Sequence, residues 1–183
     1  MSAPVAEKVG TGNWTIDTVH SHVGFAVKHM VVSTFRGRFE DYSGSLSTAE
    51  DGSPVLQGKV KVDSLQVKDE NLAAHLASPD FFDSAAYPEI EFTSTAANVG
   101  EGGELEVEGE LTIKNHTHRV TARGSISGPH VTLGDFEKLG VELEAVIDRR
   151  EYGLEWNAPL PKGGFALDND VKLQVSLELV REA

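Results

Sequence analysis

Cysteine is absent from this chain of 183 residues, and basic side chains are few. Without cysteine the chain has no disulfides, no thiolate metal ligands and no thiol redox chemistry. Lysine and arginine number 16 against 29 aspartates and glutamates, which gives a formal net charge of −13. A field of this sign repels phosphate groups. It therefore argues against nucleic acid as a partner and against an anionic membrane as a permanent docking surface.

Long apolar runs are also missing. No stretch approaches the length of about 18 consecutive apolar residues that a membrane-spanning helix needs. The first ten residues, MSAPVAEKVG, lack the apolar core of a secretory signal peptide. From these two absences we expect a cytoplasmic protein without an integral membrane segment.

The chain is rich in alternation of apolar and polar residues, which is typical of strands with one buried face. Runs with this period occur at residues 23–29, 90–93, 105–113, 120–126, 141–147 and 171–179. The phase of the alternation changes between Phe39 and Tyr42. This change predicts a bulge or bend near Glu40 and Asp41.

One segment has a different period. In residues 69–77, Leu72, His75 and Leu76 recur at i, i+3 and i+4, which is the spacing of one helical face. Asp69 precedes them and is a residue type that caps helix N-termini. We predict a short helix here, between strands.

About eight to ten strand-like runs and no linker-like segment predict one all-β domain. We favour an antiparallel barrel of about eight strands because closure removes edge strands, and a barrel of this size can hold one small ligand. The domain should cover residues 13–183, after a flexible N-terminal segment at 1–12. Small residues on the apolar faces either leave space inside or accommodate neighbouring aromatic rings, and the period leaves both open for Gly37, Gly44, Gly109, Ala122, Gly124 and Ala145.

Histidine pairs are the candidates for metal chemistry. Residues i and i+2 of a strand share a face, so His20 with His22, and His116 with His118, could each chelate a metal ion. Zinc normally takes a third protein ligand, for which the candidates are His29, His75 or a carboxylate. We favour the alternative that these histidines cap strand ends or bond to the backbone.

Two other groupings have weaker signals. Asp17, His20 and Ser21 are the residue types of a nucleophile triad, but no G-x-S-x-G elbow accompanies them. Basic residues gather in two places and would either hold an anionic head group at a barrel mouth or pair with the abundant acids. We favour pairing for these residues, which are Lys28, Arg36, Arg38, Arg149 and Arg150.

Several motifs resemble those of one known family, the YceI-like proteins. Residues 17–29, DTVHSHVGFAVKH, are similar to the family's opening motif, and residues 35–39 continue it. The most specific part is HLASPDFFD at residues 75–83 with YPEIEFTS at 87–94. The resemblance spans nearly the whole chain after Trp14.

The resemblance implies an extended, lipocalin-like antiparallel barrel with a helical cap. It also implies that a polyisoprenoid, such as a polyprenyl pyrophosphate or an isoprenoid quinone, binds in an elongated apolar tunnel for storage or transport. Many relatives carry a signal peptide and are periplasmic or secreted, whereas this chain shows none. The family motifs are not a catalytic set, so we predict a binding protein rather than an enzyme, without a cofactor or a bound metal.

Such a tunnel needs a hydrocarbon wall and a polar mouth, because burial of hydrocarbon contributes about 0.8 kcal/mol per methylene. We assign the wall to Phe25, Val27, Phe35, Phe39, Ile90 and Phe92, and the lid to Leu72, Leu76, Phe81 and Phe82. His29 and His75 would contact a polar head group, unless both histidines are structural.

Two other functions remain open at this point. One is a metal-dependent enzyme that uses the paired histidines. The other is an acid-stress or regulatory interaction module without a small ligand, in which the barrel would be filled. Apolar residues on the outer faces would also support a homodimer.

Overall fold

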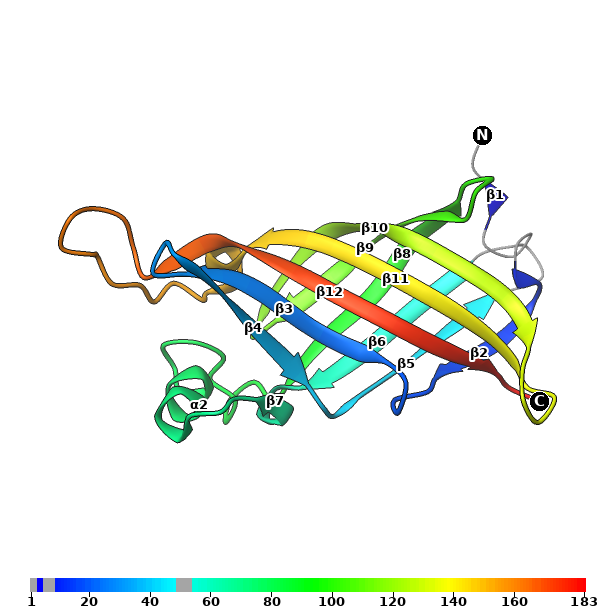
Figure 1. Cartoon of the computed structure of the whole chain (residues 1–183), viewed down its shortest axis with the longest axis horizontal. Helices are drawn as coiled ribbons and strands as arrows, with labels where there is room; N and C mark the ends of the chain where they lie inside the picture. The colour runs from blue at the N-terminus through cyan, green and yellow to red at the C-terminus, as the bar shows by residue number, and fades with distance from the viewer. Residues whose placement is uncertain (1–2, 5–8, 49–53) are drawn as a thin grey trace.

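The chain folds into a closed antiparallel β-barrel, in a computed structural model that describes residues 3–4, 9–48 and 54–183 (Figure 1). The strands are β1 (Ala3–Pro4), β2 (Gly12–Ile16), β3 (His22–His29), β4 (Ser33–Phe39), β5 (Tyr42–Thr48), β6 (Pro54–Lys61), β7 (Leu65–Gln66), β8 (Glu89–Val99), β9 (Glu104–Ile113), β10 (His116–Val131), β11 (Glu137–Asp148) and β12 (Leu167–Arg181). The helical elements are α2 (Glu70–Ala77) and two 3-10 turns, η1 (Val62–Ser64) and η2 (Arg149–Tyr152). The prediction of an all-β barrel of about eight strands with a short helix is confirmed.

Eight strand positions close the ring, because two of them are each built from two short strands. β12 pairs with β11 on one side, and on the other it pairs first with β3 and then with β2. β4 and β5 lie next to β3 and β2 in the same way. The chain bends at residues 40–41, between β4 and β5, and the predicted phase change marks this bend.

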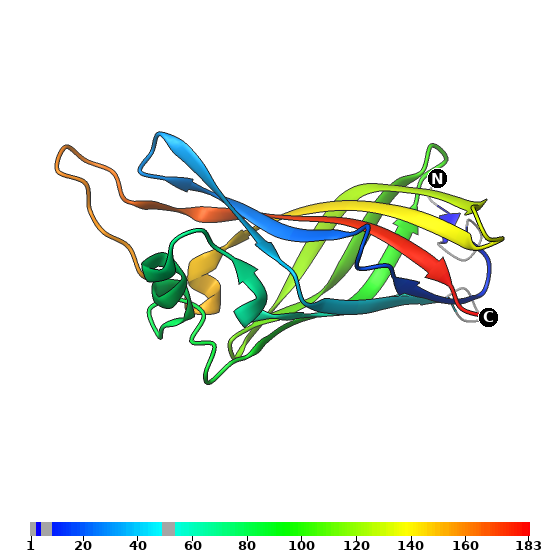
Figure 2. The ribbon, with the colours of Figure 1, turned by 60° about the horizontal axis from the view of Figure 1, so that its bottom comes forward.

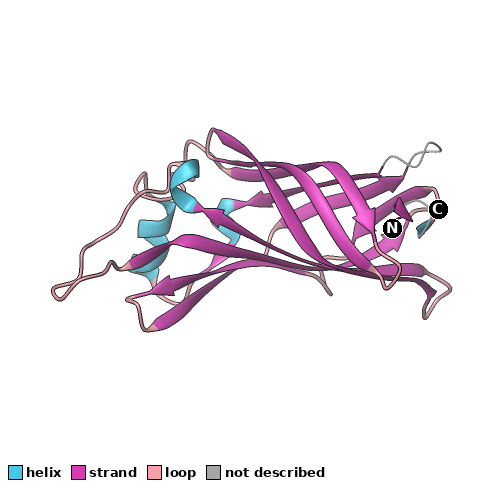
Figure 3. Cartoon of the chain, turned by 90° about the horizontal axis from the view of Figure 1, so that it is seen from above, coloured by secondary structure: helices cyan, strands magenta, loops and turns pink. Residues whose placement is uncertain are grey.

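The barrel is open on one side at the β4 end. β5 continues the ring by pairing with β6, whereas the outer edge of β4 meets only the two residues of β7 in the described part of the chain. Helix α2 and the segment after it cover this opening, beside η2 (Figure 2). Both helical elements therefore lie at one end of the barrel, and the chain termini lie at the other (Figure 3).

Helix α2 has the local signals that the sequence predicts. The Asp69 carboxylate accepts a hydrogen bond from the backbone N–H of Leu72 at 2.8 Å, which caps the N-terminus. At the other end, the backbone N–H and the hydroxyl of Ser78 both donate to the carbonyl of His75. No helix in the described residues is long and apolar enough to cross a membrane.

The core consists of two clusters at opposite ends of the barrel. The cluster near the termini is built around Trp14 and Leu179, both 0% exposed. Val9 also belongs to it and β1 pairs with β8, so the core begins before residue 13, whereas the sequence predicts a flexible segment at 1–12. Residues 1–2 and 5–8 of that segment lie outside the described residues.

The cluster near the helices is aromatic, and two of its rings pack against glycines in the barrel wall, where a larger residue would clash. Phe25 lies over its cross-strand partner Gly37, where a Cβ atom would come within 2.4 Å of the ring. Phe92 lies close to Gly109, two residues along β9 from its cross-strand partner Leu111, and a Cβ atom at Gly109 would come within 2.5 Å of the ring. These two glycines accommodate rings, as one of the two sequence interpretations holds.

The glycine at position 109 should therefore be sensitive to a single methyl group. We expect Gly109→Ala to lower the free energy of unfolding by about 1–3 kcal/mol, because the Cβ would also lie 2.6 Å from the carbonyl oxygen of Thr93, which cannot move aside cheaply. Gly58→Ala is the control, since its Cβ would meet only one atom, at 3.3 Å. Urea unfolding of both variants tests this, and equal losses would contradict it.

Candidate functional site

An apolar cavity of about 460 Å³ lies inside the barrel, next to the aromatic cluster. Along β12 its wall runs from Leu167 to Leu177, which is about 33 Å of extended strand. The cavity is therefore long rather than round. Its volume is within the range of small-molecule binding sites, about 300–1,000 Å³.

All twelve residues that the sequence assigns to a ligand site line this cavity. The wall residues come from β3, β4 and β8, and the lid residues come from α2 and the turn after it. They are Phe25, Val27, His29, Phe35, Phe39, Leu72, His75, Leu76, Phe81, Phe82, Ile90 and Phe92. Their contact with a ligand stays a prediction.

The rest of the wall comes from strands that the sequence does not single out. The inner faces of β9 to β12 contribute apolar residues along the whole cavity, including Leu111, Ile113, Val120, Ala145, Ile147, Val171, Leu173 and Val175. Their alternation was visible in the sequence as strand periodicity. The period gives the face of each strand, but it does not tell which strands surround the hollow part of a barrel.

Trp156 is the lining residue with the weakest sequence signal, because it lies in an irregular segment between η2 and β12. Its ring meets the His75 ring edge-on at a centroid distance of 4.8 Å and lies 5.4 Å from the ring of Phe81. His75 also contacts Phe81 and lies 3.1 Å from the Asp80 carboxylate. These three rings join helix α2 to the segment after η2, and so close the lid.

Arg149 is a buried cation in the wall of the cavity, 4% exposed. Its Nε donates to the carbonyl of Asp168 at 2.8 Å, and Nη1 donates to the carbonyls of Leu154 and Trp156. Within the described residues it forms no ion pair with a carboxylate. Burial lowers the pKa of Arg149, although an arginine remains charged at neutral pH. The guanidinium thus anchors the segment that carries Trp156.

The residues next to Arg149 in the turn η2 are in different environments. Arg150 is exposed and donates to the Asp148 carboxylate through both Nε and Nη2, at 3.0 and 2.6 Å. These bonds lower the pKa of Asp148 to about 2. Burial raises the pKa of Tyr152 to about 12, and its hydroxyl has no hydrogen-bond partner among the described residues. The sequence treats the two arginines as one pair, but only Arg150 forms the expected ion pair.

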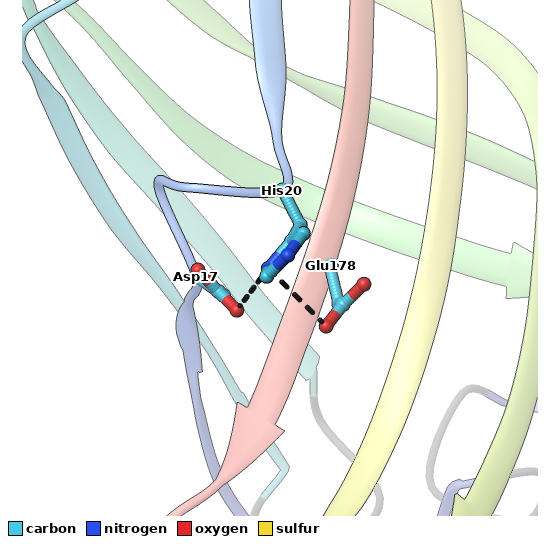
Figure 4. Close-up of side chains that lie close together, drawn as sticks. All are labelled: Asp17, His20 and Glu178. Carbon is cyan, nitrogen blue, oxygen red and sulfur yellow. Dashed lines mark hydrogen bonds and ion pairs between the residues drawn. The ribbon is translucent and has the colours of Figure 1, made fainter. Parts of the chain in front are cut away.

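A separate polar group lies outside the cavity, where the chain passes from β2 to β3 (Figure 4). His20 Nδ1 lies 2.9 Å from the Asp17 carboxylate and 4.0 Å from that of Glu178. Lys138 pairs with both carboxylates, so it neutralises the negative charge that a metal ion would need. The hydrogen bond from His20 lowers the pKa of Asp17.

The geometry does not assemble a nucleophile triad from these residues. The Ser21 hydroxyl accepts a hydrogen bond from the backbone N–H of Glu178 at 2.9 Å, which attaches the turn to β12. In the other histidine pair, His118 is used structurally, since its Nε2 lies 2.9 Å from the carbonyl oxygen of Glu151. Within the described residues, Asp17, His20 and Glu178 are the only group of three close potential metal ligands, so the two histidine pairs do not come together.

The fold and the cavity together define a class, the lipocalin-like barrels with an apolar interior. Within this class the chain belongs to the YceI-like family, whose domain matches residues 14–179. Sequence relatives include UPF0312 proteins of Staphylococcus aureus. The protein of strain USA300 is 30% identical over 169 residues, which are 91% of this chain and 96% of the relative.

Solved structures share the fold. A YceI protein of Campylobacter jejuni is 25% identical with a TM-score of 0.70, and the match covers 92% of this chain and 97% of that one. BcnA of Burkholderia cenocepacia has a TM-score of 0.74 at 22% identity over 89% of this chain and 98% of that one. A polyisoprenoid binding domain from Saccharophagus degradans, implicated in plant cell wall breakdown, has a TM-score of 0.66 at 14% identity over 92% of this chain and 98% of that one.

The two neighbouring arginines should differ sharply in their effect on stability. We expect Arg149→Met to lower the free energy of unfolding by about 3 kcal/mol, because three carbonyl oxygens lose their donor. Arg150→Met removes only an exposed ion pair and should cost less than about 1 kcal/mol. Chemical denaturation of both variants compares them, and an equal loss would show that Arg149 does not anchor the lid segment.

Proposed function

We propose that this protein binds a long-chain lipid in its internal cavity and stores or carries it. The observation that supports this most directly is the cavity itself, which is long, apolar and enclosed by the barrel wall and the lid. A binding role, rather than catalysis, also accords with Arg149, Arg150 and His118, which are each used in a structural contact.

A polyisoprenoid fits these features best. A flexible branched hydrocarbon chain needs a long apolar site and few polar contacts, and the S. degradans structure with the same fold is described as a polyisoprenoid binding domain. A polyprenyl pyrophosphate and an isoprenoid quinone share this tail and differ in the head group. Both are therefore candidates.

Hydrocarbon burial supplies enough free energy for such a complex. At about 0.8 kcal/mol per methylene, ten buried methylenes contribute roughly 8 kcal/mol, which corresponds to a Kd of about 1 μM before the cost of ordering the chain. A longer tail adds to this without any new polar contact. Affinity would thus increase with tail length until the cavity is full.

The head group would lie near Arg149, because this side chain brings a buried positive charge to an otherwise apolar wall. A diphosphate, a carboxylate or a quinone carbonyl each accepts hydrogen bonds from a guanidinium. His75 lies in the same lid and lines the cavity as well. We therefore place the polar end of the lipid under the lid and its tail along β12.

The other two functions are less well supported. An interaction module without a ligand would have a filled barrel, whereas this one is hollow. A metal-dependent enzyme would need the paired histidines to converge, and they do not do so in the described residues. A homodimer through the outer faces stays a prediction.

The first test is the content of the cavity. We expect native mass spectrometry and solvent extraction of the purified protein to recover a long-chain lipid, or the empty protein to take up an isoprenoid quinone or a polyprenyl phosphate. A protein that purifies empty and takes up neither would contradict the proposal.

A cavity-filling variant tests where the lipid lies. Ala145 lines the cavity, so Ala145→Phe should reduce lipid uptake about tenfold or more by occupying the space of the tail. Val146→Phe is the matched control, because Val146 is the next residue on β11 and is exposed on the outer face. Uptake that is unchanged in Ala145→Phe, with thermal unfolding showing a folded protein, would place the ligand elsewhere.

A further inference from the structure

Two turns project from the barrel at the end opposite the termini (Figure 2). One is the β3–β4 turn at residues 30–32, and the other is the turn at residues 160–165 before β12. They are in contact, since the backbone N–H of Met30 donates to the carbonyl of Ala166 at 2.7 Å and Val31 packs close to Gly164. Together we call residues 30–32 and 160–165 the apolar tip.

The apolar tip exposes large hydrophobic side chains to solvent. Val32 is 82% exposed, Val31 is 63% exposed and Phe165 is 59% exposed. Met30 is exposed as well and also lines the cavity, so the tip adjoins the place where the cavity reaches the surface. Contiguous exposed apolar side chains of this kind mark surfaces that contact another apolar phase.

The backbone conformation of the tip is a second, independent indication that its apolar side chains serve a purpose other than the stability of the turn. Met30 and Val31 have φ of 51° and 66°, in the left-handed region that favours glycine and asparagine. For a β-branched valine this conformation is strained. Apolar side chains therefore stand at two positions where the turn itself would be more stable without them.

The two segments that form and flank the tip carry no acidic side chain. Residues 28–39 and 156–167 contain no aspartate or glutamate, although the chain has 29 acids and a net charge of −13. They do contain exposed basic side chains, namely Lys28, Arg36 and Lys162, whereas Arg38 lies farther along β4 and pairs with Glu40. Basic side chains beside an apolar tip complement a bilayer with anionic head groups.

We infer that the apolar tip inserts into the surface of an anionic lipid bilayer and brings the mouth of the cavity to it. This inference rests on the proposed function, because a lipid cargo must be taken from a bilayer or delivered to one. The net negative charge of the protein keeps the contact transient.

The opposite end of the barrel provides a matched control. The β10–β11 turn also exposes apolar side chains, and Leu133 is 96% exposed. That turn carries Asp135 and the following strand begins with Glu137, and it lies beside the core cluster near the termini. Exposure is thus similar at both ends, whereas charge and access to the cavity differ.

A single dye at either end tests the orientation, since a protein without cysteine accepts one thiol label per variant. Val32→Cys and Leu133→Cys are each labelled with a polarity-sensitive fluorophore and mixed with vesicles of phosphatidylcholine and phosphatidylglycerol in equal parts. We expect a blue shift of the label at position 32 only, and its reversal by added salt. No shift at position 32, or equal shifts at both positions, would overturn the inference. A shift that depends on protein concentration alone would do the same, because it indicates a contact between two copies.

A double variant separates insertion from folding. Met30→Asn with Val31→Gly suits the left-handed backbone and removes two apolar side chains, so the protein should remain folded while vesicle binding weakens about tenfold or more. Unchanged binding would contradict the inference. Lipid content is measured separately by extraction. A protein that inserts but carries no lipid would refute the proposed function alone, whereas one that carries lipid and never inserts would refute the role of the tip.

Discussion

Strand β12 is paired along both edges, and the cavity depends on this pairing. One edge joins β11 from Lys138 to Asp148, and the other joins β2 and β3 in turn. A sheet that closes in this way leaves a free edge only at the outer side of β4, beyond the two residues paired with β7, and helix α2 and the segment after it lie at this opening. An open sheet of the same strands would have to pack its apolar face against something, and no empty space would remain.

The two ends of the barrel divide stability and function between them. Near the termini, large buried side chains such as Trp14 and Leu179 occupy the interior. Toward the lid, Phe25 and Phe92 lie against wall glycines, and Ala145 lines the cavity, where a larger side chain would occupy the space. The buried cluster near the termini stabilises the fold, whereas the cavity lies toward the lid.

Sequence periodicity predicted this fold well because burial on one face of a strand leaves a clear period of two. It also identified α2, whose cap at Asp69 is a local signal. It could not separate Arg149 from Arg150, or find Trp156, because these residues lie in a 3-10 turn and an irregular segment where no period applies. Their roles depend on carbonyls and rings that come from distant parts of the chain.

A hollow apolar interior has a consequence for stability as well as for binding. Side chains that border empty space lose the contacts that a packed core would give them, so the empty barrel is less stable than a filled one of the same size. A lipid that occupies the cavity restores those contacts and binds only the folded protein, and it therefore raises the free energy of unfolding by mass action. The lid held by Arg149 and Trp156 lies at this hollow end, where the gain from occupancy is greatest. Lipid binding and folding would thus be thermodynamically linked, because the same hydrocarbon contacts would supply both the affinity for the lipid and the added stability of the folded protein.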